Sequence, residues 1–199
     1  MTPDEFLKLV KSRKTIRAFK PEMPPDEDLM AVLEAGCYAP HAHPEEESWR
    51  FILVKNREIM KRFGPAASDF NKYAHGAPAW IAVAWRTSGM PDKAVDIQGF
   101  FNPDRPPPDL PEFKEFMSRS MHGLMGVGHA VQNLLLAATL RGLGVGYVGT
   151  YDPPPPSGFE RALSIKKPFC LLMILPIGYP AEDPPIKSKD FSKIVSVIE

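Results

Sequence analysis

The chain has 199 residues, a length typical of one domain or of two very small ones. Its 44% hydrophobic content is enough for a sizeable core, and 24 basic side chains balance 24 acidic ones. A neutral chain lacks the field that draws proteins to nucleic acid, so we expect no nucleic-acid partner. Cys37 and Cys170 stand far apart and outside any CxxC pattern, which argues against a disulfide framework or a cysteine-rich zinc site. The beginning of the chain shows no signal-peptide pattern, which favours a cytoplasmic location.

Helices are predicted first along the chain. Thr2, Pro3 and Glu5 form a helix-capping signature, and apolar residues recur at helical spacing from Phe6 to Val10. A second helix follows the acidic run 26–28 and ends before the proline at position 40. The next elements are two strands with a short helix between them: strand 49–54, helix about 57–63 and strand 79–85.

The longest predicted element is a helix from about Ser118 to Arg141, which stops at Gly142. Polar residues such as His129 and Gln132 interrupt its apolar face too often for a membrane span, so we expect no membrane partner. Because this helix is mostly apolar, it must be packed against other elements on nearly every side, and a partner subunit would supply part of that packing. Strands at 145–150 and 169–178 complete an α-α-β-α-β-α-β-α-β order, which predicts a layered α+β domain.

Proline is unusually frequent, with 23 residues. Many of them fall in three clusters that predict rigid extended connectors, because proline fixes φ and removes an amide donor. The clusters are 102–111, 151–158 and 181–187.

Three stretches, in this order, resemble the flavin-dependent nitroreductase family: VKSRKTIRAF, GLGVGYVGTYD and LPIGYPAEDP. The likeness spans nearly the whole chain and implies one nitroreductase-like domain over 1–199. It further implies a three-layer α-β-α fold with a central, mostly antiparallel sheet. The long helix would lie at a homodimer interface, with FMN bound where the subunits meet.

The first of these stretches has the chemistry of a phosphate site. Its cations and hydroxyl offer charge-assisted donors, and arginine adds a planar fork. In the family, a second basic pair joins the first around the FMN phosphate, and the lysines near the C-terminus match it. Each cluster alone would also suit a solvated basic face. The predicted phosphate ligands are Arg13, Lys14, Thr15, Arg17, Lys187 and Lys189.

Other matched positions imply contacts with the flavin ring. Asn71 matches an asparagine that faces the polar edge of the ring, although a surface turn would equally explain it. Gly149 and Thr150 match positions whose backbone amides face N5 and O4, where glycine permits close approach. Reduced flavin gains negative charge at its polar edge, so donors there stabilise it.

The stretch YAPHAHPEEESWRF, residues 38–51, departs from the family pattern A-P-S-x-x-N-x-Q-P-W. Relatives use this loop over the flavin, often that of the partner subunit. Pro40, His41 and Ala42 would then contact the ring, with altered polar groups. His41 and His43 before three glutamates also suggest a metal site, but the proline at 44 breaks the run and no third ligand follows. A loop detached from any ligand is the remaining alternative.

The resemblance implies an FMN-dependent oxidoreductase that takes hydride from NADH or NADPH and reduces a small acceptor, such as a nitroaromatic or quinone, in ping-pong order. The flavin carries the chemistry, so no side chain is predicted as an acid or base. A proline-rich lid at about 100–113 would set acceptor choice, and an extended tail would span about 180–199. The alternatives are a reductive dehalogenase, a flavin-fragmenting enzyme, and a non-enzymatic flavin-binding protein.

Overall fold

The computed structural model describes residues 1–41, 48–63, 69–86, 111–148, 158–186 and 188–198. Its elements are α1 (Pro3–Ser12), α2 (Asp26–Cys37), β1 (Trp49–Val54), α3 (Arg57–Phe63), the 3₁₀ helix η1 (Asp69–Gly76), β2 (Ala79–Arg86), α5 (Pro111–Leu140), β3 (Gly144–Val145), α6 (Gly158–Ala162), β4 (Phe169–Gly178) and the 3₁₀ helix η2 (Phe191–Lys193).

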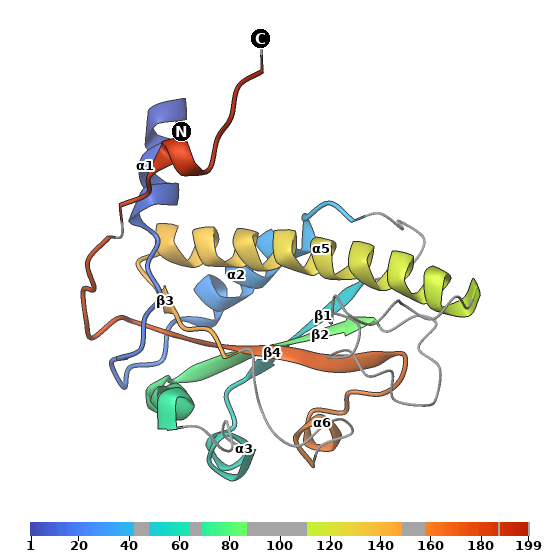
Figure 1. The fold of residues 1–199 in the computed structure, drawn as a ribbon. Helices are drawn as coiled ribbons and strands as arrows, with labels where there is room; N and C mark the ends of the chain where they lie inside the picture. Colours follow the sequence, from blue (N-terminus) through green and yellow to red (C-terminus); the bar gives the residue numbers. More distant parts are fainter. Residues whose placement is uncertain (42–47, 64–68, 87–110, 149–157, 187, 199) are drawn as a thin grey trace.

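The strands form one antiparallel sheet in the order β1-β2-β4-β3. Helices α2 and α5 cover one face, and α3 and α6 lie on the other (Figure 1). This arrangement confirms the predicted three-layer α+β fold.

Most predicted boundaries are confirmed, but two are wrong. Helix α5 begins at Pro111 rather than near Ser118, since proline suits the first position of a helix, and Phe113, Phe116 and Met117 continue the helical spacing toward the N-terminus. Strand β3 ends at Val145 rather than at 150, and 149–150 lie outside the described residues. The amide of Gly146 donates to the Pro176 carbonyl at 2.8 Å, but proline has no N–H to return the bond. The ladder therefore breaks there and resumes as a single bridge at Val148.

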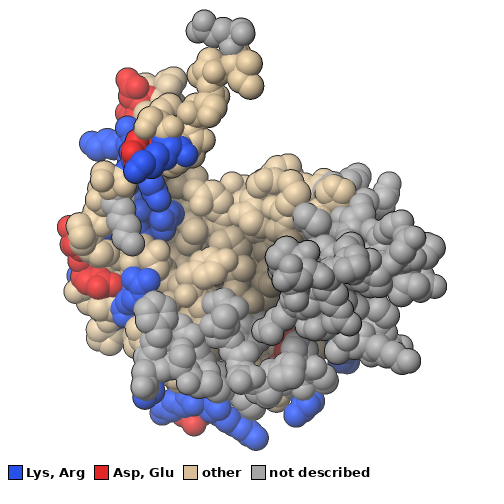
Figure 2. Space-filling model, viewed as in Figure 1, with Lys and Arg blue, Asp and Glu red and all other residues tan. Residues whose placement is uncertain are grey.

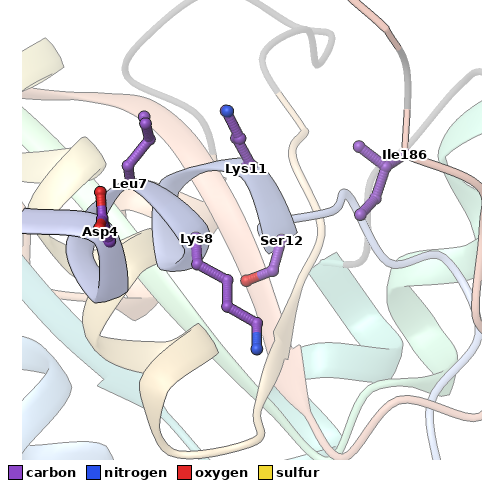
Figure 3. Close-up of a pocket in the computed structure, with 6 residues that line it drawn as sticks. All are labelled: Asp4, Leu7, Lys8, Lys11, Ser12 and Ile186. Atoms are coloured by element: carbon purple, nitrogen blue, oxygen red, sulfur yellow. The ribbon is translucent and has the colours of Figure 1, made fainter.

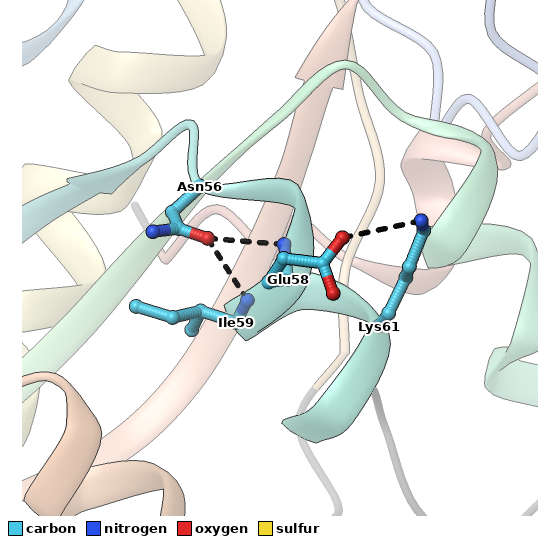
Figure 4. A network of polar contacts seen from close by, with 4 residues as sticks. All are labelled: Asn56, Glu58, Ile59 and Lys61. Atoms are coloured by element: carbon cyan, nitrogen blue, oxygen red, sulfur yellow. Dashed lines mark hydrogen bonds and ion pairs between the residues drawn. The ribbon is translucent and has the colours of Figure 1, made fainter.

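Helix starts follow the local sequence. In α1 the Thr2 hydroxyl accepts from the Glu5 amide at 3.2 Å, and the Glu5 carboxylate accepts from the Thr2 amide at 2.7 Å. This reciprocal capping box is the one the sequence predicts. In α3 the Asn56 side-chain oxygen accepts from the amides of Glu58 and Ile59 at 3.0 and 3.1 Å (Figure 4). Both caps satisfy donors that a helix leaves open in its first turn.

Strand β2 divides its side chains between two cores. Ile81 and Val83 pack with α2 and α5, whereas Trp80 and Ala82 pack with the helices on the other face. All four are buried, as expected for a strand covered on both sides. The indole N–H of Trp80 donates to the Ala74 carbonyl at 2.8 Å, so the largest core side chain also has its polar atom paired.

The beginning of β4 contains an irregularity. Ala84 pairs with Leu171 and Val83 with Met173, so Leu172 is an extra residue, as in a β-bulge. The adjacent Leu171 amide donates at 2.7 Å to the carboxylate of Glu160, a buried residue of α6. Burial, reinforced by the Glu160 charge, raises the pKa of the neighbouring Cys170 thiol to about 11, so this cysteine is a poor nucleophile at neutral pH.

Helix α5 packs closely on α2. A Cβ added at Gly36 of α2 would lie 3.0 Å from the Leu134 side chain of α5 and 2.8 Å from the Phe51 ring of β1, so glycine allows this approach. The Asn133 amide donates to the Ala35 carbonyl at 3.2 Å, and Arg141 pairs with Asp28 at 2.7 Å.

By length and composition alone the segment His122–Leu140 could cross a membrane, but it contributes five residues to the core. These are Val127, Ala130, Val131, Leu134 and Ala138.

We expect Leu134→Ala to lower the free energy of unfolding by ~2–5 kcal/mol, because Leu134 is fully buried between α2 and the sheet. Leu140→Ala, on the same helix but 68% exposed, should change it by no more than about 0.5 kcal/mol. Urea denaturation of both variants checks this expectation. Equal losses in the two variants would show that α5 does not pack as described.

Candidate functional site

The predicted phosphate motif lies along the edge of the sheet. Arg13 ends α1 in an extended conformation, and Thr15 forms a parallel bridge with Val145 of β3. The Ile16 amide donates to the Val145 carbonyl at 3.0 Å. A few residues later, Phe19 pairs with Pro180 just beyond β4. The backbone from Arg13 to Phe19 is therefore held between β3 and the segment that follows β4.

Two acidic residues of that segment reach the motif. Lys14 forms an ion pair with Asp183, and the Glu182 carboxylate accepts from the amides of Arg17 and Ala18. The Lys14 side chain is 20% exposed and that of Asp183 90% exposed, so water can compete for this pair. In Figure 2, red and blue atoms lie together on the side of the molecule where α1 and the C-terminal segment run. Part of the motif's donor capacity is thus already used.

Tyr73 of η1 joins the motif to the chain that leaves β3. Its hydroxyl donates to the Tyr147 carbonyl at 2.9 Å and accepts from the Tyr147 amide at 3.0 Å. The Arg17 guanidinium carbon lies 6.0 Å from the centre of the Tyr73 ring, at the outer limit of a cation–π contact. Burial raises the pKa of Tyr73, against opposing effects of the Tyr147 hydrogen bond and the Arg17 charge, so the hydroxyl keeps its proton at neutral pH.

The structure thus brings together three of the predicted site segments: the motif at 13–17, η1, which contains Asn71, and the chain leading towards Gly149. The backbone of Asn71 is described but its side chain is not. Lys189 is exposed, and residues 188–190 have no regular secondary structure. The predicted residues Ala42, Gly149, Thr150 and Lys187 lie outside the described residues.

Pro40 and His41 are anchored on α5. The Pro40 carbonyl lies 3.4 Å from Nδ1 of His129, and the His41 ring packs edge-on against Trp49 with 5.3 Å between ring centres. A side chain at Gly126 would come within 3.3 Å of the His41 Cβ, so a glycine in α5 allows this contact. His43 and the glutamates at 45–47 lie outside the described residues. Among the described residues, no three potential metal ligands gather.

A cavity of about 460 Å³ lies between α1 and the C-terminal segment (Figure 3). It adjoins the beginning of the motif but contains none of the predicted site residues. Its lining consists of Asp4, Leu7, Lys8, Lys11, Ser12 and Ile186.

Sequence reasoning missed the residues that organise the site. Tyr73 directly follows Asn71 and Lys72, and Glu182 and Asp183 lie within the LPIGYPAEDP stretch. Their position beside matched motifs was the available signal. Their partners, however, are more than 70 positions away in the chain, which a pattern of neighbouring residues does not show.

The profile of the Nitroreductase family matches residues 10–179, most of the chain. The chain belongs to this family. The match includes the motif at 13–17, η1 and the whole sheet, so the cluster around Tyr73 lies within the shared fold.

Relatives with several functions match this nitroreductase-family chain. A protein from Methanothermobacter thermautotrophicus, with a proposed NADH dehydrogenase/NAD(P)H nitroreductase name, is 29% identical over 90% of this chain and 80% of its own. An iodotyrosine deiodinase from Thermotoga neapolitana is 28% identical over 89% of each chain. A 5,6-dimethylbenzimidazole synthase from Rhodospirillum rubrum is 27% identical over 87% of this chain and 81% of its own.

Among solved structures, a nitroreductase with bound FMN from Desulfitobacterium hafniense superimposes with a TM-score of 0.66, at 22% identity and over 100% of both chains. At this identity the likeness supports the fold. Family and fold together identify the chain as nitroreductase-like and leave its own reaction to be determined.

Proposed function

We propose that this protein is an FMN-dependent oxidoreductase that takes hydride from NADH or NADPH and reduces a small oxidised acceptor, such as a nitroaromatic or a quinone. The observation that carries the proposal is the cluster at the sheet edge, where the basic motif, η1 and the chain leaving β3 meet around Tyr73. Membership of the nitroreductase family and the FMN-bound neighbour support it.

The residues at the edge fit a phosphate group. Arg13, Lys14 and Arg17 supply three cations from one extended segment, and Thr15 adds a hydroxyl. Glu182 and Asp183 offset part of that charge, three cations against two carboxylates, so the segment keeps an excess positive charge. Under this proposal, Lys187 and Lys189 add charge from the C-terminal segment. A phosphate that displaced the exposed Asp183 from Lys14 would gain a charge-assisted bond.

The remaining proposed ligands surround the ring. Asn71 would face its polar edge, and the backbone amides of Gly149 and Thr150 would face N5 and O4. Bound FMN would supply the hydride chemistry, and the protein would bind it, orient it and exclude water. The nicotinamide donor and the acceptor would use one site in turn, in ping-pong order. No side chain needs to act as an acid or base in this scheme.

Homodimerisation belongs to the same proposal. Pro40, His41 and Ala42 would then contact the flavin of the partner subunit, which suits the anchoring of the first two on α5. Apolar side chains on α5 and the C-terminal segment are unusually exposed for a monomer, and a partner subunit would cover them. They include Met125 at 58%, Phe191 at 73%, Ile194 at 68% and Val197 at 80%. We further propose a cytoplasmic location and a lid at about 100–113.

The names of two relatives correspond to alternative reactions for this protein. A reductive dehalogenase, as the deiodinase name indicates, would release halide from a halogenated aromatic substrate. A flavin-fragmenting enzyme, for which the dimethylbenzimidazole synthase is the model, would consume FMN during turnover. Assays for halide release and for loss of flavin distinguish these reactions from nicotinamide-driven reduction. A non-enzymatic flavin-binding protein would bind FMN that NADH and NADPH do not reduce.

The double variant Arg13→Ala/Arg17→Ala should weaken FMN binding by about tenfold or more, because each charge-assisted bond contributes ~1.5–3 kcal/mol. Fluorescence quenching of FMN on titration with protein measures the Kd. The matched control Lys61→Ala/Lys193→Ala also removes two positive charges, from exposed lysines whose ion pairs are local. An unchanged Kd in the arginine variant, or an equal loss in the control, would rule out the phosphate assignment.

Asp183→Asn should strengthen FMN binding by about two- to fivefold, because it frees Lys14 and removes a negative charge beside the phosphate site. Asp26→Asn is the control, since it breaks the exposed pair with Lys55 at 2.8 Å and removes the same charge elsewhere. The same titration measures both variants. Weaker binding in Asp183→Asn would show that the acid supports the site instead of competing with the phosphate.

A further inference from the structure

We propose that Tyr73 is a positioning residue for the flavin site, whose hydroxyl holds the Tyr147 peptide and so sets the course of the chain leaving β3 toward the flavin ring. This inference rests on the proposed function. It assigns a role to a side chain that does not itself need to touch the cofactor.

The backbone geometry shows why a hydroxyl is needed there. The amides of Gly146 and Val148 donate to carbonyls of β4, at 2.8 and 2.9 Å. Because successive peptides in an extended chain point to opposite sides, the amide and carbonyl of Tyr147 point away from β4. Two residues earlier, on the same outer side, the Ile16 amide donates to the Val145 carbonyl. At Tyr147, the Tyr73 hydroxyl is the hydrogen-bond partner of the outward-facing amide and carbonyl.

A tyrosine hydroxyl can pair with both the amide and the carbonyl of Tyr147. The hydroxyl accepts from the Tyr147 amide at 3.0 Å and donates to the Tyr147 carbonyl at 2.9 Å, as a neighbouring strand would do with two backbone groups. The raised pKa of Tyr73 keeps the proton that the second bond requires. Phenylalanine would fill the same space and make neither bond.

The ring is also closely surrounded. A Cβ added at Gly146 would lie 2.7 Å from Cε2 of Tyr73 and 2.8 Å from the Ile16 carbonyl oxygen. The Arg17 guanidinium faces the ring from the motif, at 6.0 Å. Tyr73 therefore contacts both the proposed phosphate segment and the chain that leads to the proposed ring contacts. A shift of its ring would alter both.

The test uses full-length wild type, Tyr73→Phe and the control Tyr38→Phe, which removes a hydroxyl from a side chain that is 80% exposed. For each protein we would measure the Kd for FMN and then, at saturating FMN, the visible spectrum and the reduction potential. We expect Tyr73→Phe to bind FMN about three- to tenfold more weakly, because the Tyr147 peptide loses both hydrogen bonds that hold the chain leading to the ring contacts. Its bound flavin should have an altered spectrum and a more negative potential, because donors that favour the reduced form are less well placed. Tyr38→Phe should match wild type.

The outcomes are distinct. An unchanged spectrum and potential in saturated Tyr73→Phe would overturn the inference and leave the proposed function standing, even if stability fell. Absence of FMN binding by wild type would overturn the proposed function and this inference with it. Should Tyr73→Phe fail to fold, hydrogen exchange of the wild-type protein decides. A protected Tyr147 amide would support the inference, and an amide that exchanges as fast as an unstructured one would overturn it.

Discussion

The pairing of residues 15–16 with β3 is the contact on which the rest of the site depends. It places an extended basic segment along the edge of a sheet whose central strands, β2 and β4, are largely buried. The Ile16 amide makes this contact through Val145, and close approach of the two chains requires a glycine at 144, where a Cβ would lie 2.6 Å from the Ile16 side chain. Because this segment is hydrogen-bonded to the sheet, its backbone is held in a defined place. Such preorganisation is what binding a phosphate at low cost requires.

Acidic side chains offset part of the positive charge at this edge. The chain as a whole has a formal net charge of zero, and Glu182 and Asp183 enter the motif itself. Glu182 bonds to backbone amides and therefore shapes the segment, whereas the exposed Asp183 pairs with a side chain that phosphate would also seek. The two neighbouring acids thus have different effects on the site. The lysines beyond them, at 187 and 189, are proposed to add positive charge that offsets these two acids.

Much of the fold could be predicted because its signals are local. The run at 79–85 is apolar on both sides and indeed forms a strand buried on both faces, and the Thr2 capping signature forms the predicted capping box. The start of α5 was predicted too late, although Pro111 suits a first helical position and Phe113, Phe116 and Met117 recur at helical spacing. The end of β3 could not be predicted from the local sequence, because it depends on Gly146 lying opposite Pro176 of β4.

The site divides in the same way. Arg13 and Arg17 could be proposed as phosphate ligands from the sequence, because a basic motif with a family likeness is a compact signature. Tyr73 and Glu182 could not, because a lone tyrosine or glutamate has no signature until folding supplies its partner. Residues proposed to touch a ligand therefore emerge from the sequence more readily than residues whose role depends on partners far away in the chain.

The most direct test of the account is the visible absorption spectrum of the purified protein with FMN, followed without oxygen after NADH or NADPH is added. If the protein is an FMN-dependent oxidoreductase, its bound flavin spectrum should bleach within seconds and return when a quinone or nitroaromatic is added. A bound flavin that stays oxidised would contradict the oxidoreductase assignment and favour a flavin-binding protein. The absence of any bound flavin would contradict the site itself.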